Sequence, residues 1–191
     1  MMKETDSERR RRFDALFAAH REDIVSYCSW RTRTTSDAQD AAAEVFVTAW
    51  RRLDELPDGD AARVWLYATA RRVIANHRRS SRRRERLQER LVLEAAVPRP
   101  APEDTADALV HEALSRLGAR DREVLLLAEW EGLSPTEIAA VVGCLTVTAR
   151  GRLHRARRRF RVVFEELLSN ESRHARPHSS ARQRRVRHEH V

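Results

Sequence analysis

The sequence predicts an all-α protein built from two small helical domains that a flexible linker joins. Apolar residues recur at three- and four-residue spacing along most of the chain, which is typical of amphipathic helices. No segment keeps the period-two alternation of a half-buried strand. Charged residues make up 35% of the 191 residues and only five residues are glycine, a composition that favours helix over sheet.

Three helices are predicted in a first block, residues 10–80, after an N-terminal extension at residues 1–9. The first helix runs from Phe13 to Cys28. The second follows TTSD, in which Ser36 or Asp37 can cap the first turn. The segment LDELPDGDAA is predicted to be a loop because it contains proline and glycine. The third helix turns an apolar stripe inward, which is composed of Trp65, Leu66, Thr69, Ala70, Val73, Ile74 and His77.

A linker is predicted at residues 81–105, where three prolines lie within five residues and oppose helix continuation. Its basic first part can extend the third helix by a few turns. A second helical block follows at residues 106–168. Residues 169–191 carry almost no apolar side chains, so they are predicted to form a disordered basic tail.

The most specific local pattern is a helix-turn-helix in GLSPTEIAAVVGCLTVTARGRLHRARRRF. Ser134, Pro135 and Glu137 combine an N-cap, a first-turn proline and a capping-box glutamate, and Gly143 suits a left-handed C-cap. A second helix begins near Thr146. In such a unit the first turns of the second helix meet base edges in the major groove. The candidate duplex-reading residues are Thr148, Arg150, Gly151, Arg152, His154 and Arg155, and a merely solvated arginine face is the alternative.

Arginines further along this helix, at positions 157, 158, 159 and 161, are expected to hold phosphate or meet water. The net charge of +8 also favours a polyanionic partner, either nucleic acid or an anionic membrane surface. No run is apolar enough to span a membrane and the N-terminus resembles no signal peptide, so a cytoplasmic, soluble protein is expected.

No cofactor, metal or catalytic set is indicated by the sequence. Cys28 and Cys144 lie far apart without CxxC spacing, which favours two small packing residues over a zinc site or a disulfide. Paired carboxylates, a nucleophile with its base and a glycine-rich phosphate loop are all missing from the pattern. We therefore do not expect an enzyme.

An acidic face is predicted on the second helix, where Asp37, Asp40 and Glu44 follow at three- and four-residue spacing. It is either a solvated face or a docking surface for a basic partner.

Together, DAQDAAAEVFVTAWRRLDEL, VWLYATARRVIANHRR and the helix-turn-helix resemble an extracytoplasmic-function sigma factor of the sigma-70 family. The resemblance covers about residues 10–168 and keeps the family's order and spacing. It implies a sigma region 2 bundle and a sigma region 4 helix-turn-helix. The implied partners are core RNA polymerase, through its beta-prime clamp and beta subunits, promoter DNA, and an anti-sigma factor.

The resemblance also implies residue roles. Asp40, Glu44, Val45 and Phe46 match the region that docks on the beta-prime clamp. The loop from Leu53 to Ala62 matches the one that captures a flipped base of the minus-ten element. The residues that the resemblance assigns to minus-ten DNA binding are Leu56, Trp65, Tyr67, Arg71, Arg72, Arg78 and Arg79. Core packing is the alternative for Trp65 and Tyr67.

The six residues of the helix-turn-helix match positions that read the minus-35 element as duplex. The sequence departs from the family at Leu145 and Val147, where serine and glycine are frequent, and at Arg72, where asparagine is frequent. Two other functions fit the composition. One is a helix-turn-helix regulator whose N-terminal helices dimerise or sense a ligand, and the other is a basic RNA-binding or membrane-surface protein.

Overall fold

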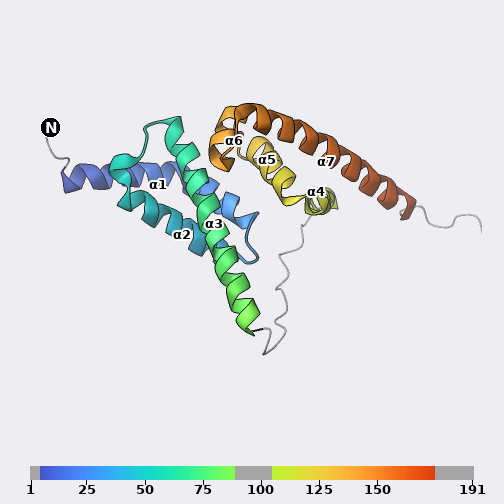
Figure 1. The fold of residues 1–191 in the computed structure, drawn as a ribbon, viewed down its shortest axis with the longest axis horizontal. Helices are drawn as coiled ribbons and strands as arrows, with labels where there is room; N and C mark the ends of the chain where they lie inside the picture. The colour runs from blue at the N-terminus through green and yellow to red at the C-terminus, as the bar shows by residue number, and fades with distance from the viewer. Residues whose placement is uncertain (1–4, 89–104, 175–191) are drawn as a thin grey trace, which may run out of the picture.

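The computed structural model describes residues 5–88 and 105–174, and within these ranges the chain is helical without any strand. The predicted all-α class is confirmed. A first block contains α1 (Asp6–Ser29), α2 (Thr35–Arg51) and α3 (Asp60–Gln88), and a second contains α4 to α7 (Figure 1). Among the described residues, no helix is long and apolar enough to cross a membrane.

Side-chain caps fix where the first two helices begin. Thr5 and Glu8 form a reciprocal capping box, so α1 begins at Asp6, earlier than its apolar stripe suggests. At α2 the cap is Thr34, whose hydroxyl accepts the amide of Asp37 at 3.0 Å. The prediction of Ser36 or Asp37 as the cap was wrong, because the threonine before them reaches the free amides of the first turn.

The core of the first block lies where α1, α2 and α3 meet. Small alanines let the helices approach closely, while Ile24, Tyr27 and Leu66 fill the space between them. Cys28 is fully buried there, and burial raises the pKa of its thiol to about 12. It is therefore an inert packing residue, as the sequence predicts.

The connection from α2 to α3 is anchored to α1. It contains a short 3-10 turn, η1 (Leu53–Glu55), and Leu53 is buried. Arg9 donates to Asp54 at 2.5 Å and to the Trp50 carbonyl at 2.9 Å, and Arg12 donates to the Leu53 carbonyl. These contacts hold the start of the loop against the bundle.

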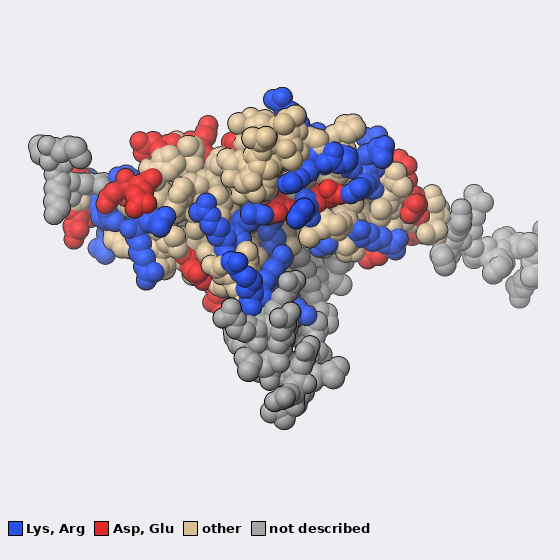
Figure 2. Space-filling view, in the orientation of Figure 1, with Lys and Arg blue, Asp and Glu red and all other residues tan. Residues whose placement is uncertain are grey.

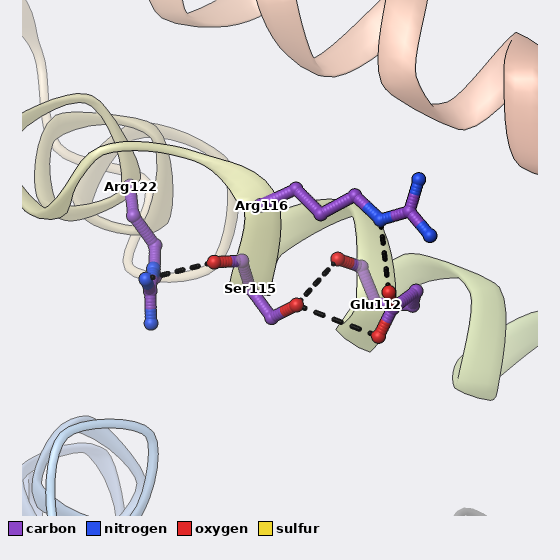
Figure 3. Close-up of polar contacts among 4 residues, drawn as sticks. All are labelled: Glu112, Ser115, Arg116 and Arg122. Atoms are coloured by element: carbon purple, nitrogen blue, oxygen red, sulfur yellow. Dashed lines mark hydrogen bonds and ion pairs between the residues drawn. The ribbon is translucent and has the colours of Figure 1, made fainter.

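The second block begins with α4 (Thr105–Arg116) and α5 (Ala119–Glu129), and the hydrogen bonds of one arginine stabilise the turn between them. Arg122 donates to the carbonyls of Ser115 and Leu117, both at 3.2 Å, which satisfies orphan acceptors at the end of α4. Ser115 and Arg116 also donate to Glu112, at 2.7 Å to its carbonyl and 2.9 Å to its carboxylate (Figure 3).

The helix-turn-helix is formed by α6 (Pro135–Val142) and α7 (Thr146–His174). The predicted capping box of Ser134 and Glu137 is present, and Gly143 adopts the left-handed conformation with φ of 71°. On α7 the inward residues Ala149, Leu153 and Ala156 are buried. The predicted helix-turn-helix is therefore confirmed as a structural unit.

Two arginines of α7 have internal partners. Arg157 donates to Glu129 at 2.7 Å, and Arg159 donates to the largely buried carboxylate of Asp121. Both acids lie on α5. Both arginine side chains are still more than half exposed, so these pairs are compatible with the expectation that they meet water, and phosphate binding stays a prediction.

The ends of the long helices pass the predicted boundaries. α3 continues to Gln88, and the rest of the predicted linker to residue 104 lies outside the described residues. α7 continues to His174, six residues into the predicted tail, and residues 175–191 lie outside the described part.

Candidate nucleic-acid interface

The outer face of the first turns of α7 carries the candidate duplex-reading residues. The buried side chains of Ala149, Leu153 and Ala156 fix the orientation of this helix. Arg150, His154 and Arg155 are consequently exposed, whereas Thr148, Gly151 and Arg152 are half-buried. A planar guanidinium can bond guanine O6 and N7 together or grip a phosphate. The outward orientation predicted for Arg150, His154 and Arg155 is confirmed, and their role in reading duplex DNA stays a prediction.

Gly151 is not required by the fold. A Cβ atom at this position would meet only the flexible guanidinium end of Arg155, at 3.4 Å. Glycine inside a helix is nevertheless less stable than alanine by about 1 kcal/mol. Nothing in the surrounding protein compensates for this cost, so the missing side chain leaves room on the outer surface of the helix.

A second basic face lies on α3. Arg72, Arg78 and Arg79 are exposed, and basic side chains gather along α3 and α7 on the face shown in Figure 2. Arg78 donates to the Arg31 carbonyl at 2.7 Å, and Arg79 donates to Asn76 at 2.5 Å. These arginines keep their positive charge at the surface, where a nucleic-acid backbone can reach it.

Tyr67 and Arg71 lie on a different side of α3, against the second block. Tyr67 is 1% exposed, and its hydroxyl donates to Glu131 Oε2 at 2.8 Å. Arg71 pairs with Glu123 at 2.9 Å, and Arg63 lies 3.9 Å from Glu137. In this arrangement Tyr67 is inaccessible to DNA and Arg71 has its charge neutralised. For Tyr67 the alternative of core packing therefore holds in this conformation of the chain, whereas the Arg71 side chain is 41% exposed beside Glu123 and its contact with DNA stays a prediction.

The Tyr67–Glu131 contact is buried but incompletely satisfied. Burial raises the pKa of the Glu131 carboxyl and of the Tyr67 hydroxyl, because each charged form would lose its hydration. Glu131 Oε1 and the neighbouring Tyr27 hydroxyl have no hydrogen-bond partner. A half-satisfied buried polar network is costly, so these two unpartnered oxygens weaken the contact between the blocks.

Aromatic rings complete this contact. Trp30, at the end of α1, stacks on His111 of α4 at 4.4 Å and meets Trp130 edge-on at 5.4 Å. No local sequence pattern predicts this cluster, since Trp30 precedes His111 and Trp130 by about 80 and 100 positions. Trp65 and Leu56 are half-buried and pack against the core, so each combines core packing with an accessible edge.

The acidic face of α2 is exposed, as the spacing predicts. Asp40 and Glu44 point to the surface, where Glu44 bonds His77 at 2.7 Å. Val45 and Phe46 are 0% and 4% exposed, so they hold α2 against the bundle and cannot touch a partner directly. Their assignment as polymerase contacts is corrected.

Val47, unlike Val45 and Phe46, is exposed on the surface of α2. It is 47% exposed and follows Asp40 and Glu44 by seven and three residues, which puts the three on one side of the helix. The sequence analysis overlooked it, although the same helical spacing was sufficient to find it.

Comparison with known proteins agrees with this division of the chain. Residues 16–84 match the model of sigma-70 region 2, and residues 107–160 match that of sigma-70 region 4. The ECF RNA polymerase sigma factor SigL of Mycobacterium tuberculosis is 30% identical over 159 residues, covering 80% of this chain and 89% of SigL. The probable RNA polymerase sigma-C factor of Mycobacterium bovis is 32% identical over 149 residues, covering 77% and 80%.

Two solved structures share the fold. The sigma factor RpoE of Bartonella quintana, in complex with the anti-sigma factor NepR, has a TM-score of 0.68 at 23% identity and covers 80% of this chain and 96% of its own. CnrH, in complex with the cytosolic domain of CnrY, has a TM-score of 0.61 at 24% identity, with 82% and 90% covered. Because the first block matches sigma-70 region 2, the alternative of a simple helix-turn-helix regulator is not favoured. The chain therefore belongs to the extracytoplasmic-function sigma factors of the sigma-70 family.

Proposed function

We propose that this chain binds core RNA polymerase, recognises the minus-35 and minus-ten promoter elements, and promotes DNA melting for transcription initiation. The proposal rests on where the acidic and basic surfaces of the chain lie. An acidic face on α2 and a basic face on α3 belong to the region 2 block, while a basic helix-turn-helix belongs to the region 4 block. The chain itself performs no catalysis, and it acts in the cytoplasm with the polymerase.

The polymerase contact is assigned to Asp40, Glu44 and Val47. Two exposed carboxylates beside an exposed apolar side chain suit a basic surface with an apolar centre, such as the beta-prime clamp. Val45 and Phe46 act indirectly, because their burial fixes the position of this face.

Minus-ten DNA is assigned to the accessible part of α3 and its preceding loop. Arg72, Arg78 and Arg79 supply a cationic track for an opened strand, and Leu56 and Trp65 supply apolar surface for an unstacked base. The minus-35 duplex is assigned to Thr148, Arg150, Gly151, Arg152, His154 and Arg155 on α7.

Tyr67 and Arg71 can join the minus-ten track only after the two blocks separate, since Glu131 and Glu123 of the region 4 block occupy them. Reading two promoter elements at once also requires the blocks to lie apart. We infer that polymerase binding is accompanied by opening of this contact. An anti-sigma factor, the kind of partner bound to the structural relative RpoE, is the inhibitor expected to oppose it.

Charge reversal on α2 tests the polymerase assignment. Asp40→Lys with Glu44→Lys should weaken binding to core polymerase about tenfold or more, because attraction becomes repulsion. The matched control is Asp14→Lys with Glu22→Lys, which makes the same change in net charge at exposed sites on α1. Binding is measured by fluorescence anisotropy of the labelled full chain. Equal affinities for the two double variants would refute the docking face.

A further inference from the structure

Leu145 and Val147, at the start of α7, have the most exposed large apolar side chains among the described residues. Their exposed fractions are 73% and 72%, and every other large exposed apolar side chain in the described part is at or below 51%. Scattered apolar residues are normal on protein surfaces. Here two of them lie two residues apart in the sequence, at the end of the helix where the candidate duplex-reading residues begin.

Helix stability does not explain either residue. The Leu145 carbonyl accepts the Ala149 amide at 3.0 Å, so leucine occupies the N-cap position of α7. Leucine is among the poor N-cap residues because its side chain has no oxygen for the free amides. Val147 is β-branched and loses side-chain freedom in the first helical turn. Departures from local preference without a packing gain are expected at functional sites.

The helical repeat places Val147 on the face already assigned to DNA. Val147, Gly151 and His154 follow at four- and three-residue spacing, opposite the buried stripe of Ala149 and Leu153. Val147 lies about 6 Å along the axis before Gly151. Val147 is thus continuous with the basic face at its N-terminal end, and Leu145 precedes the helix by one residue.

The surrounding charge indicates the kind of partner. Arg150, Arg152, Arg155 and Arg158 all follow within eleven residues of Val147, and no acidic residue occurs on α7 before Glu165. A polyanion is favoured by this surface over a basic or neutral protein. The apolar group that duplex DNA presents in the major groove is the thymine C5 methyl.

We propose that Leu145 and Val147 read thymine methyl groups in the minus-35 duplex and so help to set its sequence. The proposal rests on the proposed function, because it needs α7 to enter the major groove there. The first turn of a recognition helix is the part that meets base edges. An apolar side chain at this point prefers an A·T pair, while the arginines that follow prefer guanine or phosphate.

Replacement of thymine by deoxyuridine tests this directly, since it removes only the methyl group. The full chain, bound to core RNA polymerase, first selects its element from a random duplex library. Each thymine of the selected element is then replaced singly. For the unmodified chain, one or two replacements should weaken binding about fourfold, the value of one buried methyl group.

Variants connect the methyl effect to the two side chains. In Leu145→Ala and Val147→Ala the deoxyuridine effect should fall below about twofold at the position that each residue contacts. Alanine has the higher helix propensity, so the fold is kept. Val162→Ala is the control, because Val162 is 51% exposed on the same helix about 22 Å further along. It should retain the full effect.

A wrong methyl-reading proposal and a wrong proposed function give different experimental results. An element in which no thymine replacement matters, or an effect that persists in both alanine variants, would overturn the methyl-reading proposal while leaving duplex recognition intact. If polymerase carrying this chain selects no duplex element at all, the proposed function fails, and the methyl-reading proposal fails with it.

Discussion

The contact between the two blocks depends on one buried hydroxyl, and Tyr67→Phe removes it. The Tyr67 hydroxyl donates to Glu131 Oε2 at 2.8 Å, while Glu131 Oε1 has no partner. Without the hydroxyl, the carboxyl of Glu131, a residue that is only 9% exposed, loses this hydrogen bond in the closed arrangement. Once the blocks separate, water can solvate the same carboxyl. The variant should therefore shift the chain toward the open arrangement.

The size of the shift follows from the cost of an unsatisfied buried acceptor. That cost is about 1–3 kcal/mol, and it corresponds to roughly a 5- to 150-fold change in the ratio of open to closed molecules. The aromatic contacts of Trp30 and the Arg71–Glu123 ion pair are unchanged by the substitution. The change is thus confined to a single hydrogen bond.

Distances between spin labels measure this ratio. Labels on cysteines introduced at Ala43 of α2 and Arg120 of α5, both exposed, report one block each. Cys144 is replaced by serine, and Cys28 is fully buried and keeps its place. The unmodified chain should give one short distance, and Tyr67→Phe should add a longer, broader distribution.

Tyr27→Phe is the matched control. Tyr27 is also fully buried and its ring lies 5.2 Å from that of Tyr67, but its hydroxyl has no hydrogen-bond partner. Removal of this hydroxyl should leave the distance distribution unchanged. Identical distributions for the two variants, or no longer distance in Tyr67→Phe, would refute the reasoning that the Tyr67–Glu131 bond holds the blocks together.

Three further predictions concern other parts of the chain. Gly151→Ala should stabilise the fold by about 0.5–1 kcal/mol in thermal unfolding and weaken minus-35 duplex binding, whereas unchanged binding would show that the space at this position is unused. The raised pKa of Glu131 means that the closed form holds its proton more tightly, so the short label distance should fade as pH rises from about 4.5; a pH-independent distribution would contradict this. Val47→Asp should weaken core-polymerase binding without changing the melting temperature, and a retained affinity would remove Val47 from the docking face.

Helix positions and the helix-turn-helix could be predicted from the sequence because their determinants are local. Ser134, Glu137 and Gly143 lie within ten residues, and each satisfies backbone groups of its own helix. The inward stripe of α7 also sets which arginines face outward. Local chemistry was therefore sufficient to orient α7, and the reading of duplex DNA by its outer face stays a prediction.

Contacts between segments that are distant in the chain could not be predicted from the sequence. Tyr67 and Glu131 are 64 residues apart, and Arg159 meets Asp121 across 38 residues. On α7, Arg157 and Arg159 pair with acidic residues of α5, whereas Arg150 and Arg155 face outward from the first turns. Only tertiary packing distinguishes the two groups. Val45 and Phe46 are a different case: the resemblance assigned them to the docking face, although helical spacing separates them from Asp40 and Glu44.

In vitro transcription is the measurement that tests the central claim most directly. Purified core polymerase is combined with the full chain on a library of genomic fragments, and start sites are mapped. The account predicts new start sites that depend on the chain and are preceded by two shared elements at a fixed spacing. Absence of chain-dependent start sites, or protection of a symmetric operator without polymerase, would contradict it.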